Sequence, residues 1–150
     1  NIPYLYGINQ TLTKELQMGL DMYAYASNVK DIECEVNPEK EIKEQTEELA
    51  YWRKHNRLHG WFQNKWENKM GGMEDQPFNC VRYYVDSHDL DELEFDLKGK
   101  LLPDTEGFFF GNDSYSYDEK EEQIKFDLKF VEDARKALKQ GKHVYYTSWW

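Results

Sequence analysis

The chain has 150 residues, a length that suits one domain burying about 70% of its unfolded surface. Its 29 acidic residues outnumber its 19 basic ones and give a formal net charge of −10, which disfavours direct nucleic-acid binding because that binding needs a cationic surface. No apolar run approaches the roughly 18 residues of a membrane span, and two cysteines are too few for a disulfide scaffold, so we expect a cytoplasmic protein without membrane contact.

The first half of the chain is expected to hold one strand and one long helix. Apolar and polar residues alternate over residues 20–26, which predicts the first strand. Asn37 can cap a helix and Pro38 suits its first turn, and acidic residues follow. These signals predict a helix from residue 37 to about residue 66.

The second half is expected to alternate strands and helices. Residues 79–85 predict a second strand, and Ser87 caps a helix with leucines at helical spacing. Residues 107–111 predict a short aromatic strand bounded by glycines. A long helix over 118–140 follows, and residues 143–150 predict the last strand.

These elements predict an α+β or α/β fold. We expect a single domain with a sheet of about four strands and three helices packed on it. Residues 1–17 are interpreted as an extension, either native or introduced for expression, because Met18 resembles a natural start. The domain itself would then span residues 18–150, with no internal repeat and no clear linker.

Residues 51–62 carry the strongest functional signal. They combine four aromatic residues, three cations, an amide and two histidines. On the expected helix, Arg53, Asn56 and His59 share one stripe and could hold a phosphate or carboxylate, with Trp52 as a stacking wall. A buried polar network that fixes the helix is the alternative of equal weight. Catalysis with His59 as general acid or base is a third interpretation.

The expected ligand site draws on three parts of the chain. In the pairs Tyr83-Tyr84 and Tyr145-Tyr146, one ring should face the core while the other could line a cleft, because strand side chains alternate. The candidate ligand-binding residues are Trp52, Arg53, Asn56, His59, Trp61, Tyr83 and Tyr145. No catalytic residue is assigned, and no phosphate loop, dinucleotide fingerprint or nucleophile elbow is present.

A metal site is not expected. His55 and His59 have the spacing that lets two imidazoles reach one metal ion from a helix. The glutamate of the zinc-protease motif is missing, because position 56 is Asn. We therefore expect neither a metal nor another cofactor.

The chain resembles a family of small proteins encoded by phages, prophages and bacteria. The resemblance covers residues 18–150 and rests on five segments at 18–23, 51–62, 83–85, 107–111 and 145–150. His55 departs from the family pattern, which has a small residue there, and this further weakens a paired-histidine metal site. No activity is assigned to that family, so the resemblance implies a phage and host context rather than a chemistry.

Three hypotheses for function follow. The leading one is a small phage-type protein that binds a nucleotide-like or other anionic small molecule, and so sequesters a signalling molecule in the host cytoplasm. The second is an acidic interaction protein that mimics nucleic acid and inhibits a host enzyme, motivated by the charge of −10. The third is a hydrolase using His59. The expected partners are an anionic small molecule or a host protein, and a homo-oligomer is an open alternative.

Overall fold

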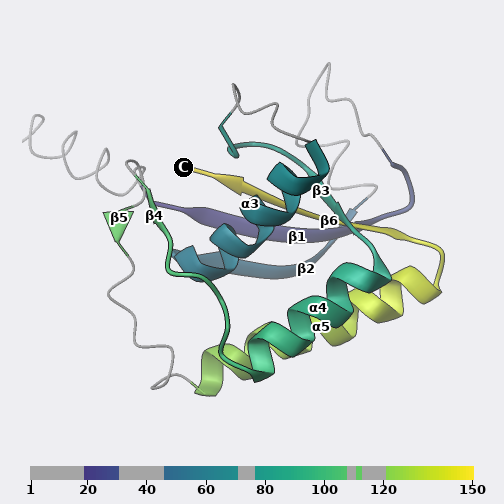
Figure 1. Cartoon of the computed structure of the whole chain (residues 1–150). Coiled ribbons are helices and arrows are strands. Elements are labelled where there is room, and N and C mark those ends of the chain that lie inside the picture. The colour runs from purple at the N-terminus through teal and green to yellow at the C-terminus, as the bar shows by residue number, and fades with distance from the viewer. Residues whose placement is uncertain (1–18, 31–45, 71–76, 108–110, 113–120) are drawn as a thin grey trace, which may run out of the picture.

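The computed structural model describes residues 19–30, 46–70, 77–107, 111–112 and 121–150. In that part of the chain, four antiparallel strands form one sheet in the order β2-β1-β6-β3 (Figure 1). The strands are β1 (Asp21–Ser27), β2 (Thr46–Arg53), β3 (Tyr83–Val85) and β6 (His143–Trp149). The helices are α3 (Asn56–Met70), α4 (Ser87–Lys98) and α5 (Glu121–Lys139). This single α+β domain with three helices confirms the predicted fold class.

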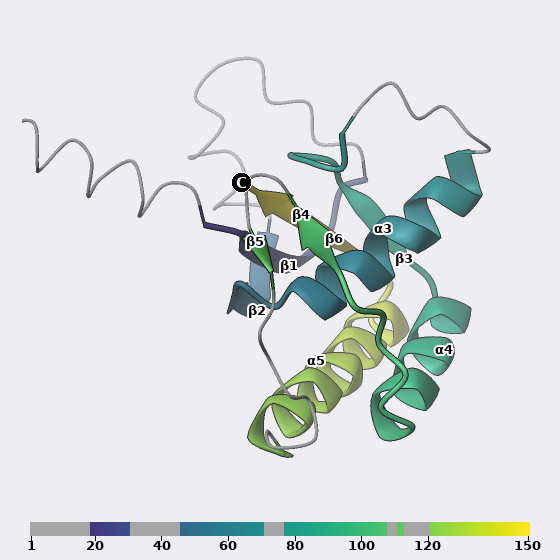
Figure 2. The ribbon, with the colours of Figure 1, turned by 60° about the vertical axis from the view of Figure 1, so that its left-hand side comes forward.

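The three helices lie on the same side of the sheet, as Figure 2 shows. Phe62 of α3 stacks on Tyr146 of β6, with ring centroids 4.1 Å apart. Phe130 of α5 meets the Trp52 ring of β2 edge-on at 5.2 Å. The α4 leucines Leu90, Leu93 and Leu97 are fully buried in the same core. The core therefore fills the space between this face of the sheet and the helices.

The prediction of one helix over residues 37–66 is wrong for residues 46–53. Residues 46–53 form strand β2, which pairs with β1, and the helix begins only at Asn56. Glutamate and leucine near residue 48 favour a helix locally, but pairing with β1 buries Ala50 and Trp52, and this tertiary gain outweighs propensity. Lys54, at φ 57°, separates the strand from the helix. Residues 37–45 lie outside the described part.

Two other strand predictions need correction. The second strand covers only Tyr83–Val85, because Cys80 takes a φ of 59° that a strand residue does not adopt. The expected single strand over 107–111 is wrong, since β4 (Glu106–Gly107) and β5 (Gly111–Asn112) pair with each other. The residues between them, 108–110, lie outside the described part.

The other predicted elements are confirmed. Strands β1 and β6 and helices α4 and α5 lie where the sequence pattern placed them. The cap of α4 is Asp86 instead of Ser87, and its carboxylate accepts a hydrogen bond from the Asp89 backbone N–H. Gly141 lies just after the end of α5 and has a φ of 80°, a conformation that glycine adopts without strain. None of the helices in the described ranges is long and apolar enough to cross a membrane.

Candidate functional site

The structure does not bring Arg53, Asn56 and His59 together. Consecutive side chains of a strand point to opposite faces, so Trp52 faces the helices while Arg53 lies on the other face. There its guanidinium is 2.8 Å from the Asp21 carboxylate of β1, in a partly exposed ion pair. Asn56 and His59 belong to α3, on the side of the sheet that the helices cover, and each is only 1% exposed. The predicted concave site of these three residues is therefore not formed.

His59 belongs to a buried polar contact. Its Nδ1 lies 2.7 Å from the hydroxyl of Tyr146, and its ring packs against Phe78. Burial lowers the pKa of His59 to about 4, so the imidazole is neutral at pH 7. This geometry matches the structural alternative, a polar network that fixes α3 on the sheet. It gives no support to a hydrolase that would need His59 to reach a substrate.

Three more of the expected ligand residues serve the core. The indole N–H of Trp52 donates to Asp127 at 2.8 Å, and that of Trp61 donates to Asp96 at 2.8 Å. The Tyr83 hydroxyl donates to Asp89 at 3.0 Å. Each ring is thus buried with its polar atom satisfied by a carboxylate, the usual arrangement of aromatic residues with a polar handle. Of the seven candidates, only Tyr145 and Arg53 lie on the opposite face of the sheet.

That opposite face is rich in tyrosine. Because Met22 and Ala24 face the helices, their neighbours on β1 point the other way, and the same alternation holds on the adjoining strands. We call the resulting surface the tyrosine face; its rings are those of Tyr23, Tyr25, Tyr51, Tyr84 and Tyr145. Neighbouring ring centroids lie 5.1 to 5.9 Å apart. The rings therefore form a nearly continuous aromatic row, in which Tyr51 is 42% exposed and Tyr145 is buried at 1%.

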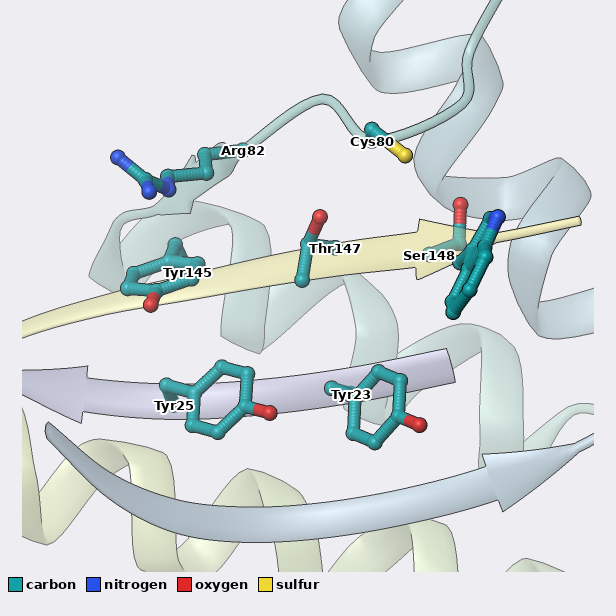
Figure 3. Close-up of a pocket in the computed structure, with 8 residues that line it drawn as sticks. Tyr23, Tyr25, Cys80, Arg82, Tyr145, Thr147 and Ser148 are labelled. Atoms are coloured by element: carbon teal, nitrogen blue, oxygen red, sulfur yellow. The ribbon is translucent and has the colours of Figure 1, made fainter. Parts of the chain in front are cut away.

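A pocket of about 290 Å³ opens on this face (Figure 3). Tyr23 and Tyr25 border it along β1, and Tyr145 borders it from β6. Its lining consists of Tyr23, Tyr25, Cys80, Arg82, Tyr145, Thr147, Ser148 and Trp149. The volume lies at the lower end of the range of small-molecule sites, about 300 to 1,000 Å³. The pocket therefore suits one compact ligand.

The segment before β3 places Arg82 at the pocket. The Asn79 side chain bonds both the backbone N–H and the carbonyl of Trp150, at 3.0 and 3.1 Å. The positive φ of Cys80 lets its N–H donate to the Ser148 carbonyl at 2.8 Å. Anchored in this way, the segment sets the Arg82 guanidinium 5.7 Å from the ring centre of Tyr145.

Charges of both signs surround the tyrosine face. Arg82 and Lys30 lie over the rings of Tyr145 and Tyr84, toward the β6 and β3 side. Carboxylates lie toward the β1 and β2 side, where Asp21 accepts hydrogen bonds from Tyr51 and Arg53. Burial, followed by the negative charge of Glu48, raises the pKa of Tyr25 to about 12. The phenol of Tyr25 is therefore a neutral donor and a stacking surface at pH 7.

A second polar cluster lies inside the core. The Asp127 carboxylate of α5 is 2.7 Å from His55 Nε2 and accepts a hydrogen bond from Gln123 at 3.0 Å. Both His55 and Asp127 are almost completely buried, at 4% and 0% exposure. Within the described ranges, no three His, Cys, Asp or Glu side chains are placed to hold one metal ion. The cluster ties α5 to the start of α3 and does not border the pocket.

Sequence reasoning missed most of the tyrosine face, although its signal was present. Tyr23 and Tyr25 alternate with Met22 and Ala24, which places both rings on one face of a strand. The contribution of Arg82 depends on the turn at Cys80, which no local pattern indicates. No family model, no curated protein and no solved structure matches this chain. The resemblance to phage-encoded proteins therefore stays a prediction.

Proposed function

We propose that the protein binds a small molecule with a planar ring and an anionic group, such as a nucleotide, on the tyrosine face. The observation that carries this proposal is the pocket bordered by Tyr23, Tyr25 and Tyr145, with the Arg82 guanidinium at its rim. It replaces the expected site around Asn56 and His59 but keeps the expected class of ligand.

The aromatic rings would supply most of the affinity. A base stacked on an aromatic side chain gains about 1 to 3 kcal/mol, and any planar ring can use such a surface. Tyrosine presents this surface with little loss of side-chain entropy, and the Thr147 hydroxyl lies in the same pocket to accept or donate a hydrogen bond. The pocket therefore offers both stacking and a small number of polar contacts.

Arg82 would supply the contact with the anion. A guanidinium can donate two parallel hydrogen bonds to a phosphate or carboxylate, which fixes the orientation of the ligand. The net charge of −10 repels a long polyanion, so a nucleic-acid strand is disfavoured while a single nucleotide near Arg82 is not. In a phage-infected host, such a protein would sequester a nucleotide-like signalling molecule without transforming it.

Calorimetric titration with AMP tests the proposal. Arg82→Ala should weaken binding about tenfold or more, since a hydrogen bond to a charged group contributes about 1.5 to 3 kcal/mol. Tyr23→Ala should weaken it by a similar factor through lost stacking. Lys129→Ala is the matched control, because it removes one cation from α5, on the helix-covered side. Absence of AMP binding, or equal losses in Arg82→Ala and the control, would contradict the proposal.

A further inference from the structure

Strand β2 contains a bulge that changes which residue reaches the tyrosine face. Ala24 pairs with Ala50, but the next residue of β1, Tyr25, pairs with Glu48, so Leu49 is the extra residue. In a regular ladder Glu48 would lie opposite Ala26, which is 2% exposed in the core. The bulge instead sets Glu48 beside Tyr25. Bulges often re-aim side chains in this way next to binding sites.

Glu48 differs from Asp21, the other carboxylate that the described residues place on this face. Asp21 already accepts hydrogen bonds from Tyr51 and Arg53. Glu48 is exposed and, among the described residues, no cation lies within ion-pair distance of it. Its negative charge contributes to the raised pKa of both Tyr25 and Tyr23, after burial in each case. Glu48 is therefore an acceptor close to the pocket rings that no described group occupies.

One row of residues crosses the whole face from an acid to the cations. The row is Glu48 on β2, Tyr25 on β1, Tyr145 on β6 and Tyr84 on β3. Neighbouring tyrosine rings in it lie 5.5 Å apart, and Arg82 and Lys30 cover its far end. Strands are spaced about 4.8 Å apart, so the Glu48 strand and the Tyr145 strand are separated by about 10 Å. A ligand on this row meets an acceptor at one end and a cation at the other.

Resting on the proposed function, we infer that Glu48 selects ligands whose planar ring carries an amino group. The amino group would donate a hydrogen bond to the Glu48 carboxylate while the anionic group of the same ligand lies at Arg82. The ring between them would stack on Tyr25, which is partly exposed, whereas Tyr145 is only 1% exposed. The substrate class is thus an aminated nucleotide-like anion about 10 Å long.

Two nucleotides that differ only in the amino group test this inference. AMP carries it, whereas purine riboside 5′-monophosphate has hydrogen at the same ring position. The wild-type protein should bind AMP about tenfold more tightly, the scale of one hydrogen bond to a charged acceptor. Glu48→Ala should reduce this preference to less than threefold, mainly by weakening AMP. Binding of purine riboside 5′-monophosphate should stay constant or strengthen, because a negative charge is removed.

Glu47→Ala is the matched control. Glu47 carries the same charge on the same strand but lies opposite Ala26, and its carboxylate is 3.6 Å from Lys142. This variant should keep the tenfold preference for AMP. Equal binding of the two nucleotides to the wild type, or an unchanged preference in Glu48→Ala, would overturn the inference and leave the proposed function standing. Absence of binding by both nucleotides would overturn the proposed function, and the inference with it.

Discussion

Asp127 shows how single residues tie this fold together. Its carboxylate has no exposed surface and bridges β2, the start of α3 and α5 through contacts with Trp52, His55 and Gln123. A buried carboxylate is tolerated only when its oxygens are well paired, and removal of one partner of such a pair typically destabilises a protein by about 3 to 5 kcal/mol. This one residue therefore ties the end of β2 and the start of α3 to α5.

His59 predicts a pH dependence of stability. Its pKa is about 4 in the folded state because it is buried, against about 6.5 in the unfolded chain. Between these values the unfolded chain binds a proton that the folded chain does not. The contribution of His59 to stability is therefore fully present well above pH 6.5 and falls as the pH drops toward 4. From pH 7.5 to pH 5, this one residue should remove about 2 kcal/mol. Urea denaturation across this range measures the effect.

Comparison with two variants isolates the contribution of His59. His59→Gln should have a flatter pH dependence than the wild type, whatever its absolute stability, because it cannot gain a proton. His88→Gln should follow the wild-type slope, since the His88 side chain is 80% exposed on α4. Parallel slopes for the wild type and His59→Gln would show that burial of His59 does not govern the acid response.

At the scale of elements, strand alternation and helical spacing each predicted part of the structure. Residues 20–26 alternate, and β1 lies there; the apolar spacing in α4 and α5 located those two helices. Strand β2 was missed because Glu47, Glu48 and Leu49 favour a helix locally, and only pairing with β1 shows which side chains are buried. The bulge at Leu49 arises from the same pairing, so it too could not be inferred from the sequence.

The candidate site, too, could be predicted only in part from the sequence. Alternation correctly indicated that one tyrosine of each neighbouring pair faces the core and the other does not. It could not indicate which one: Tyr83 faces the helices, whereas Tyr84 and Tyr145 point to the tyrosine face, where the Tyr145 ring is itself buried. Assigning Arg53, Asn56 and His59 to one helix stripe failed because the chain changes from strand to helix between the first and the other two.

At Gly60, helix α3 passes very close to the segment that leads into β4. A methyl group at Gly60 would lie only 2.8 Å from Thr105 Cβ, in the segment that leads into β4. Although alanine favours a helix by about 1 kcal/mol over glycine, Gly60→Ala should lower the free energy of unfolding by about 1 to 3 kcal/mol through this overlap. Chemical denaturation of the purified variant measures it.

A double-mutant cycle separates the overlap from other effects. Thr105→Gly removes the side-chain atoms that the new methyl would meet, so the double variant should recover most of the stability lost by Gly60→Ala. A coupling energy near zero would mean that Thr105 does not limit the approach to α3.

At the scale of the whole molecule, the net charge depends on acidic residues of which those in the described ranges can be placed. Many of them pair within the fold: Arg135 binds Asp91 and Glu94 across α4 and α5, and Lys65 contacts Glu92. A nucleic-acid mimic needs a continuous line of accessible negative charge, and carboxylates already paired with cations contribute little to one. The ion pairs of the described ranges therefore lend no support to mimicry of nucleic acid by those residues.

The whole chain should fold without a metal ion. His55 and His59 have a spacing that can bind zinc, but in the fold His55 Nε2 contacts Asp127 while His59 Nδ1 contacts Tyr146. Each imidazole thus has its own buried partner, on α5 in one case and on β6 in the other. A structural zinc would contribute about 10 to 16 kcal/mol of binding free energy, so its removal would lower the Tm measurably. Treatment with EDTA should leave the Tm unchanged, and zinc added afterwards should not raise it. A fall of several degrees on chelation that zinc reverses would contradict this prediction.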